Sequence, residues 1–253
     1  MGVTTTKTNK PLNPRGNDQS PLAYNRAKLY SGKALDFDGV NDYVTFDGFA
    51  GTLSNNDAWT ACGYIKTNAD IRGTWFSAHT STGGNVIRVG TESGADGLFY
   101  ADVITGDAQI GDFDFKDNKW HFVALSRVQG ANGALVTLFV DGVQSGTQAT
   151  GPNWDSATQF SLGQEYDGAG KTDFWDGLLA NFKIFNTALT AAQVADLYNN
   201  PEKVVPTGVD NTALKLWLPM MEGAGTTAYD GSGNGNHGTI SGATYVNGVG
   251  APV

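Results

Sequence analysis

The sequence is poor in cysteine, in basic residues and in long hydrophobic runs. Its single cysteine, Cys62, has no second cysteine with which to form a disulfide within the chain. No apolar run approaches the about 20 residues of a membrane-spanning helix. The start of the chain, residues 1–8, lacks the apolar stretch of a secretory signal, so export by that route is not expected.

Basic residues are outnumbered by acidic ones. The 16 lysines and arginines face 25 aspartates and glutamates, which gives a formal net charge of −9 and a pI near 4.6. Nucleic acids and anionic membranes are bound through clustered positive charge, so neither is an expected partner. The acidic side chains either form a solvated surface or supply carboxylates to calcium.

What the chain does contain is typical of an all-β protein. There are 34 glycines, 8 prolines and 40% hydrophobic residues, arranged as short apolar runs between turn residues. One domain over residues 31–253 is expected, preceded by a polar arm over residues 1–30 that is either extended or disordered. The one expected helix, 191–199, follows a capping box formed by Thr190 and Gln193.

Residues 120–146 predict a β-meander. The run 120–127 is apolar on both alternating faces, as expected of a central strand that is covered on both sides. His121 and Arg127 are expected to reach solvent. Asp141-Gly142 is a strong signal for the second hairpin. Further strands are expected near 35–37, 43–46, 59–65, 73–78, 86–89 and 98–103.

This meander resembles the central part of laminin-G-like and pentraxin-like jelly rolls. The stretches 34–44, 160–167 and 177–186 are similar to other strands of the same family. The resemblance implies an antiparallel β-sandwich, a concanavalin A-like jelly roll, with one short helix. This fold hosts lectins, glycosidases, adhesion modules and viral coat components, so it does not by itself define a function.

The C-terminal segment resembles the part that normally opens such a domain. Residues 214–219 and 228–240 carry this similarity, so 206–253 is expected to be a permuted or strand-swapped closing segment, with a truncated second copy as the alternative. Leu214–Leu218 alternates aliphatic side chains with Lys215 and Trp217 and predicts a strand. The glycine-rich loop 230–237 is interpreted as a tight polar turn rather than a cation site.

A possible metal site lies in the stretch Gly-Gln-Glu-Tyr-Asp that ends at residue 167. It resembles the calcium loop of pentraxins, which implies side-chain ligands from Glu165 and Asp167 and a carbonyl ligand from Tyr166. Asp173 and Asp176 are close enough in sequence to complete the six to eight oxygens that calcium takes. The alternative is an acidic turn exposed to solvent.

Candidate ligand contacts are aromatic or lie near that loop. The family's second acidic contributor aligns with residues 83–85, where only Asn85 remains and the carboxylate is missing. Trp154, Trp175 and Tyr166 are candidates for stacking on sugar rings, although tryptophans in sandwiches more often anchor the core or its loops.

No catalytic pattern is evident. The Glu-x-Asp-x-x-Glu cluster of glycosidases with this fold is absent, and the nearest pair, Asp112 and Asp114, is better interpreted as the exposed face of a strand. The chain is therefore not expected to be an enzyme.

The sequence thus predicts a non-catalytic binding or structural module. A bacteriophage virion surface protein fits best, decorating a capsid or forming part of a tail or fibre after assembly in the host cytoplasm. Its expected partners are glycans or other virion or cell-surface proteins, with homo-oligomers if the tail is swapped. The alternatives are an extracellular carbohydrate-binding adhesin module and a divergent glycoside hydrolase.

Overall fold

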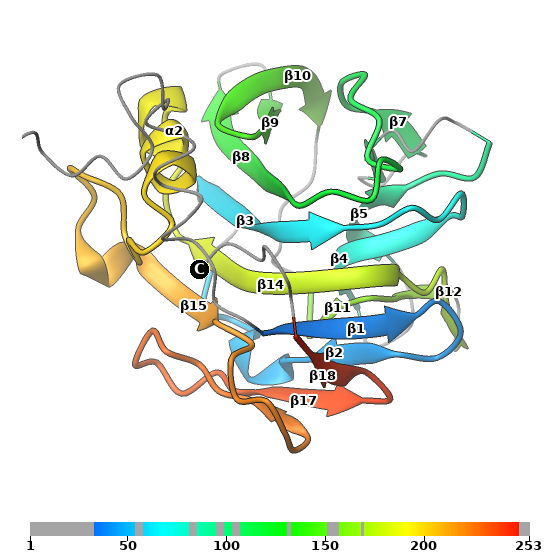
Figure 1. Ribbon diagram of the computed structural model, residues 1–253. Helices are drawn as coiled ribbons and strands as arrows, with labels where there is room; N and C mark the ends of the chain where they lie inside the picture. Colours follow the sequence, from blue (N-terminus) through cyan, green and yellow to red (C-terminus); the bar gives the residue numbers. More distant parts are fainter. Residues whose placement is uncertain are drawn as a thin grey trace, which may run out of the picture.

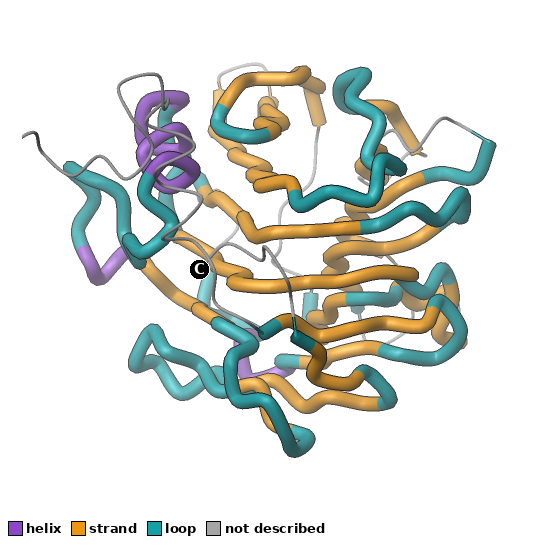
Figure 2. The backbone as a smooth tube through the Cα atoms, in the orientation of Figure 1, coloured by secondary structure: helices purple, strands orange, loops and turns teal. Residues whose placement is uncertain are grey.

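The chain forms a sandwich of antiparallel sheets (Figure 1). The computed structural model describes residues 33–53, 58–80, 85–94, 99–102, 107–130, 133–150, 157–167 and 170–247. In these ranges strands dominate and helix is scarce, as Figure 2 shows. The predicted all-β jelly-roll class is confirmed. The expected arm, 1–30, lies outside the described residues.

Two eight-stranded sheets and a small hairpin make up the sandwich. The first sheet, sheet A, runs in the order β10 (Val143–Thr150), β9 (Gly133–Val140), β8 (His121–Gly130), β3 (Trp59–Lys66), β14 (Asp176–Phe185), β1 (Ala34–Asp38) and β18 (Thr244–Val246), with β15 (Leu214–Leu218) also on β14. Sheet B runs in the order β16 (Thr227–Ala228), β17 (Gly238–Ser241), β2 (Tyr43–Thr45), β11 (Gln159–Leu162), β4 (Gly73–His79), β5 (Asn85–Thr91), β6 (Phe99–Asp102) and β7 (Asp107–Gln109). The hairpin pairs β12 (Glu165–Asp167) with β13 (Gly170–Thr172), and the helical segments are η1 (Asp47–Phe49), α2 (Ala191–Asn199) and η2 (Asn211–Ala213).

The predicted meander is β8–β9–β10. In β8, Val123 and Leu125 face the core between the sheets, and Phe122 lies in a second apolar cluster on the outer face of sheet A. Asp141 and Gly142 have φ angles of 50° and 81°, the left-handed conformation that the Asp-Gly turn of a tight hairpin requires. The strand is therefore covered on both sides, as its pattern predicts.

The expected exposure of two charged residues in this strand is wrong. His121 and Arg127 are 7% and 2% exposed. The imidazole of His121 lies between two carboxylates, with Nδ1 2.9 Å from Asp141 and Nε2 3.0 Å from Asp117. Loops beyond the strand supply these partners, so a polar residue can be buried where the strand pattern alone indicates an exit to solvent.

Helix α2 begins and ends as predicted. The Thr190 side chain accepts a hydrogen bond from the Gln193 amide, and the Gln193 side chain accepts one from the Thr190 amide. Val194 and Leu197 pack in the outer cluster of sheet A, beside β10. The helix therefore covers an outer face rather than an edge of the sandwich. It is far too short to span a membrane, and the described ranges contain no other helix that could.

The C-terminal segment completes both sheets of its own chain. Strand β15 pairs with Phe182–Phe185 of β14, and β1 pairs with the preceding half of β14. Strands β1 and β15 therefore lie end to end along the same side of β14. Strand β17 extends sheet B beyond β2, and β18 extends sheet A beyond β1. The expected strand at Leu214–Leu218 is confirmed, and it pairs with β14 of the same chain.

The polar loop before β17 fastens this segment. The carboxylate of Asp230 accepts hydrogen bonds from the amides of Trp217, Ser232 and Asn236 at 2.9–3.0 Å. The side-chain amide of Asn236 also donates to the Lys215 carbonyl at 3.1 Å. The loop is thus a tight polar turn bonded to β15, in agreement with its interpretation from sequence.

Candidate functional site

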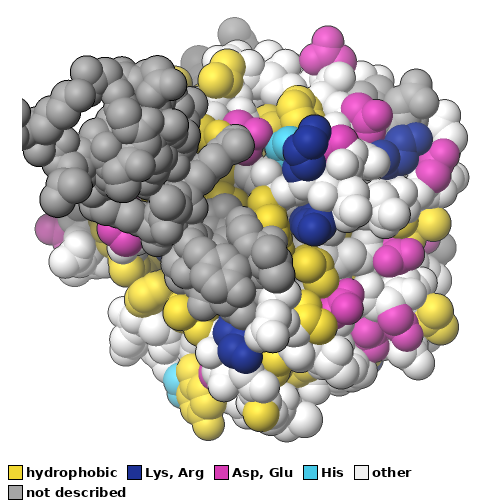
Figure 3. Space-filling view, in the orientation of Figure 1, with side chains coloured by type: hydrophobic (Ala, Val, Ile, Leu, Met, Phe, Trp, Pro, Cys, Tyr) yellow, Lys and Arg dark blue, Asp and Glu magenta, His cyan; other side chains and the backbone are white. Residues whose placement is uncertain are grey.

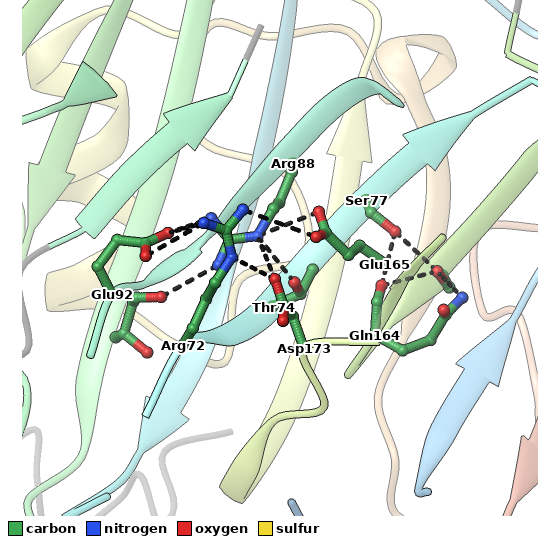
Figure 4. Close-up of polar contacts among 10 residues, drawn as sticks. Arg72, Thr74, Ser77, Arg88, Glu92, Gln164, Glu165 and Asp173 are labelled. Atoms are coloured by element: carbon green, nitrogen blue, oxygen red, sulfur yellow. Dashed lines mark hydrogen bonds and ion pairs between the residues drawn. The ribbon is translucent and has the colours of Figure 1, made fainter. Parts of the chain in front are cut away.

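The structure brings Glu165 and Asp173, two of the five predicted calcium ligands, into one cluster with two arginines (Figure 4). Arg88 Nε lies 3.2 Å from Glu165 Oε2, and Arg72 Nη2 lies 3.7 Å from Glu165 Oε1. Arg72 Nε donates to the carboxylate of Asp173. Glu92 closes the cluster, 2.8 Å from Arg88 Nη1 and 3.3 Å from Arg72 Nη1. The arginine–carboxylate cluster is defined here as these five residues.

Arg88 lies at the centre of this cluster and is fully buried. Strand β5 fixes its backbone, and its guanidinium also donates to Thr74 Oγ1 at 3.2 Å and to the Thr91 carbonyl at 3.1 Å. A buried guanidinium is tolerated only when its charge and its N–H groups are matched in this way. The surrounding carboxylates and oxygen acceptors therefore hold Arg88 in place, and Arg88 in turn holds the hairpin.

The carboxyl groups of the cluster outnumber its guanidinium groups by three to two. Burial raises the pKa of Glu165, and the hydrogen bond to Asp173 raises it further, against the lowering influence of Arg88 and Arg72. Protonation of Glu165 brings the charges into balance. The cluster is thus electrostatically saturated by its own side chains.

These residues do not fit a calcium ion. Calcium takes six to eight oxygen ligands at about 2.3–2.6 Å, but the oxygens of Glu165 and Asp173 face guanidinium nitrogens. Asp176 lies elsewhere, opposite Asp38 in the β1–β14 pairing. Figure 3 shows several other acidic side chains spread over the face of the molecule in view. In the described part of the chain no three His, Cys, Asp or Glu side chains are placed to hold a metal. The side chain of Asp167 lies outside the description.

Backbone and side-chain bonds anchor the start of the hairpin on sheet B. The carbonyl of Gln164 accepts from the hydroxyls of Ser77 at 2.7 Å and Ser161 at 3.1 Å, and its side-chain amide donates to Ser161 at 2.7 Å. The Gly163 amide donates to the Trp75 carbonyl at 3.2 Å. The hairpin consequently lies against β4 and β5.

Beyond the cluster, the hairpin places an aromatic and a basic side chain on sheet B. Tyr166 packs on His79, with 3.8 Å between ring centroids. The Nζ of Lys171 lies 3.7 Å from the centroid of Tyr43 and 5.8 Å from that of Tyr166. Hydrogen bonds to Lys171 and Ser241 lower the pKa of Tyr43. These four side chains, His79, Tyr166, Lys171 and Tyr43, are called the Tyr–Lys cluster.

His79 is the buried member of the Tyr–Lys cluster. It is 0% exposed, and neither ring nitrogen has a hydrogen-bond partner. Burial lowers the pKa of this histidine to about 4, against the raising influence of the Thr80 backbone and the Gln159 side chain. At neutral pH His79 is therefore an uncharged ring beneath Tyr166.

The surface beside the hairpin is the open face of sheet B, which points away from sheet A. Strand register aligns one row of side chains across this face: Thr239, Thr45, Ser161, Ser77 and Arg88. Ser161, Ser77 and Arg88 are covered, whereas Thr239 is exposed and Thr45 half-buried. The uncovered part of the row, next to Tyr43 and Lys171, offers hydroxyl groups beside aromatic rings.

The structure places the residues predicted to contact a ligand in different surroundings. Trp175 is 1% exposed, so its predicted role as a stacking surface for sugars is wrong; it is a core residue beside the hairpin. Tyr166 is half-buried in the Tyr–Lys cluster. Asn85 pairs with His79 in the sheet, but its side chain lies outside the description, and so does Trp154. Asp112 and Asp114 are exposed in the connection before β8, which is not a strand.

Sequence reasoning missed Arg72, Arg88, His79 and Lys171. The alternation of Tyr43 and Thr45 with the core residue Val44 was a usable signal for the open face, because neighbouring residues of a strand point to opposite sides. For the arginines the local sequence offers only Glu92, four residues after Arg88, because the other two carboxylates come from a distant hairpin.

The antiparallel jelly-roll sandwich is a lectin-like fold, and the outer face of sheet B is partly open and polar. The chain belongs to the concanavalin A-like lectin/glucanases superfamily, because residues 38–195 match the laminin-G-like family model of that description. The match ends before β15, so the closing strands lie outside it. The comparison with curated protein sequences gave no match.

Solved structures with this fold include several carbohydrate-related proteins. A Bacteroides ovatus protein whose proposed role is carbohydrate binding has a TM-score of 0.64 and 19% identity, over 87% of this chain and 60% of its own length. A pentraxin from Limulus polyphemus has a TM-score of 0.53 and 21% identity, over 66% and 82%. A module of a Ruminococcus gnavus sialidase, bound to α2,3-sialyllactose, has a TM-score of 0.53 and 12% identity, over 67% and 99%. This chain thus spans less than two thirds of the first of these proteins.

Proposed function

We propose that this protein is a non-catalytic glycan-binding module, which binds its ligand on the open face of sheet B beside the hairpin β12–β13. The observation that carries the proposal is the Tyr–Lys cluster next to the uncovered hydroxyls of Thr45 and Thr239. Sugars are bound by aromatic rings that contact their C–H faces and by polar groups that bond their hydroxyls. Both kinds of group are present here, and the structurally similar Ruminococcus gnavus module was solved with bound α2,3-sialyllactose.

The non-catalytic part of the proposal rests on the state of the carboxyl groups. Glu165 and Asp173 form a close pair, and a raised pKa is what a catalytic acid needs. Yet the Glu165 side chain is only 4% exposed and faces two guanidinium groups, so it cannot reach a glycosidic oxygen. The pair is therefore assigned to holding the hairpin.

The test is a glycan array, followed by calorimetric titration of the best ligand. Tyr43→Ala and Lys171→Ala should weaken binding by about tenfold or more, and Tyr43→Phe should retain most of it because the ring remains. Lys119→Ala is the matched control, since Lys119 is 74% exposed on a connection of sheet A. Absence of binding, or equal affinity of all four variants, contradicts the proposal. Release of sugar from a bound glycan contradicts its non-catalytic part.

A place on a virion surface is the wider role proposed for the module. Its support is the acidic composition and a sandwich whose two sheets are closed by the chain's own tail. Mass spectrometry of purified particles from the source tests it. Recovery of the protein from cell-surface fractions without particles favours the adhesin alternative instead.

A further inference from the structure

We propose that Arg72 and Arg88 do the work of a metal ion in this sandwich: they hold the hairpin β12–β13 on sheet B, so that the hairpin is ordered, and the module binds its ligand, without calcium. The ligand half of this statement rests on the proposed function; the hairpin half does not.

The two arginines lie where a bridging cation would have to be. Such a cation has to contact Glu165 and Asp173 on the hairpin and be held in place by the sheet. The guanidinium of Arg88 meets both conditions, because it is fully buried on β5 and contacts both carboxylates, at 3.2 Å and 3.7 Å. Arg72 contacts the same two carboxylates from the other side. The two guanidinium groups thus fill the position where an ion would have to be bound.

Two guanidinium groups carry the same charge as one divalent cation, and they face Glu92, Glu165 and Asp173. Their N–H groups are directional donors that match carboxylate oxygens, which makes arginine suited to such bridges. An additional divalent ion would lie against two like charges in a buried place. The cluster therefore excludes calcium while it supplies an equivalent attraction.

The hairpin connects the arginine–carboxylate cluster to the ligand face. The carboxylates are at the two ends of the hairpin, Glu165 at its first residue and Asp173 just after its last. The residues between them place Tyr166 on His79 and Lys171 over Tyr43. Arg72 and Arg88 are consequently positioning residues for the Tyr–Lys cluster, although neither is placed to touch the glycan.

The experiment measures melting temperatures in 2 mM EDTA and in about 5 mM calcium chloride. The wild-type protein should melt at the same temperature in both. The double variant R72Q/R88Q leaves three carboxylates without a counter-charge, so it should melt lower in EDTA and gain about 5 °C or more from calcium. Terbium binding, followed by luminescence excited through nearby tryptophans, should saturate at one ion per chain in the double variant. The wild type should give no such signal.

Controls separate the proposal from a general loss of structure. R72K keeps the positive charge at this position and should show no calcium gain, and adding E165Q to the double variant should abolish the gain of that variant. If R88Q prevents folding, R72Q alone serves, because Arg72 is 36% exposed; it should show a smaller gain of the same sign. A calcium-dependent rise in the wild type, or no calcium gain in any folded arginine variant, overturns the proposal.

Glycan affinity supplies the functional readout. Wild-type affinity should be equal in EDTA and in calcium, whereas R72Q/R88Q should bind about tenfold more weakly in EDTA and recover with calcium. Weaker binding that is caused by a general loss of structure would not recover with calcium. If the wild type binds no glycan, the proposed function fails, while the melting and terbium measurements still decide the hairpin half of the inference.

Discussion

The side chain of Asp141 joins two neighbouring residues of β8: its Oδ2 lies 2.9 Å from His121 Nδ1, and its Oδ1 accepts a hydrogen bond from the Phe122 amide at 2.9 Å. A carboxylate from the β9–β10 turn thus fixes the start of the central strand. Asp117 contacts the other imidazole nitrogen at 3.0 Å. This arrangement makes the start of β8 sensitive to the protonation of one histidine.

The first prediction follows from that histidine. Burial alone would lower the pKa of His121, but the hydrogen bonds to Asp141 and Asp117 outweigh it and raise the pKa above 6.5. The charged form therefore stabilises the fold below pH 6.5, and this contribution is lost as the pH rises through the folded pKa. His121→Gln should cost about 1.5–3 kcal/mol at pH 5.5 and clearly less at pH 9, measured by urea unfolding. Equal costs at the two pH values would show that the ion pairs do not form.

The second prediction concerns His79, whose contribution to stability should depend on pH in the opposite direction. Its folded pKa of about 4 lies below the ordinary 6.5, so the unfolded chain takes up a proton first as the pH falls. Stability should fall between pH 6.5 and pH 4 by at most about 3 kcal/mol. His79→Phe keeps the contact with Tyr166 and should remove this part of the acid sensitivity without loss at pH 7.5, since it leaves no unpaired nitrogens. Unchanged acid sensitivity in the variant would contradict the assignment.

The third prediction concerns the glycine before the hairpin. Gly163 has φ +82°, and a Cβ there would lie 2.6 Å from the Phe37 ring. Gly163→Ala should therefore cost the about 1–2 kcal/mol of a left-handed alanine and a further amount for the clash. Gly51→Ala is the control, because Gly51 has φ +76° and nothing within 4 Å of the added carbon. Urea unfolding should show a clearly larger loss for Gly163→Ala; similar losses would mean that Phe37 moves aside at little cost.

The fourth prediction tests the closing strand β15. Leu216 is 0% exposed in the core between the sheets, so Leu216→Ala should cost about 2–4 kcal/mol. Lys215→Ala, one residue away and pointing outward, should change the free energy of unfolding by no more than about 0.5 kcal/mol. Thermal or urea unfolding measures both. A small effect of Leu216→Ala would show that the tail folds independently of the sandwich.

The sequence predicts those parts of the fold that depend on local patterns. The double-sided apolar alternation of residues 120–127, the Asp141-Gly142 turn and the capping box of Thr190 each specify a geometry within a few residues, and each is found in the structure. The strand at 214–218 could also be predicted, because its alternation of aliphatic residues with Lys215 and Trp217 shows which side is buried. The structure contains this strand.

The candidate site is harder to predict because its contacts are made across the fold. Glu165 and Asp173 look like metal ligands when only their own loop is considered, and nothing near Arg88 in sequence shows that it will meet them. His121 and Trp175 fail for a related reason: His121 is buried against the carboxylates of Asp117 and Asp141, and Trp175 packs in the core between the sheets. Patterns of period two report which face a residue takes, but not which partner it meets there.

The pairing of β1 with strands from the other end of the domain has a consequence for biosynthesis. Strand β1 lies between β14 and β18, with Ala34 opposite Val246, and β15 continues its line along β14. Until the ribosome has made residues 214–246, β1 and β14 lack these neighbours and present open strand edges. The sandwich can close only after residue 246 has left the exit tunnel, so its completion waits for the whole domain and depends on long-range strand pairing, which is slow. Nascent chains stalled before this point are the form of the protein that most needs a chaperone.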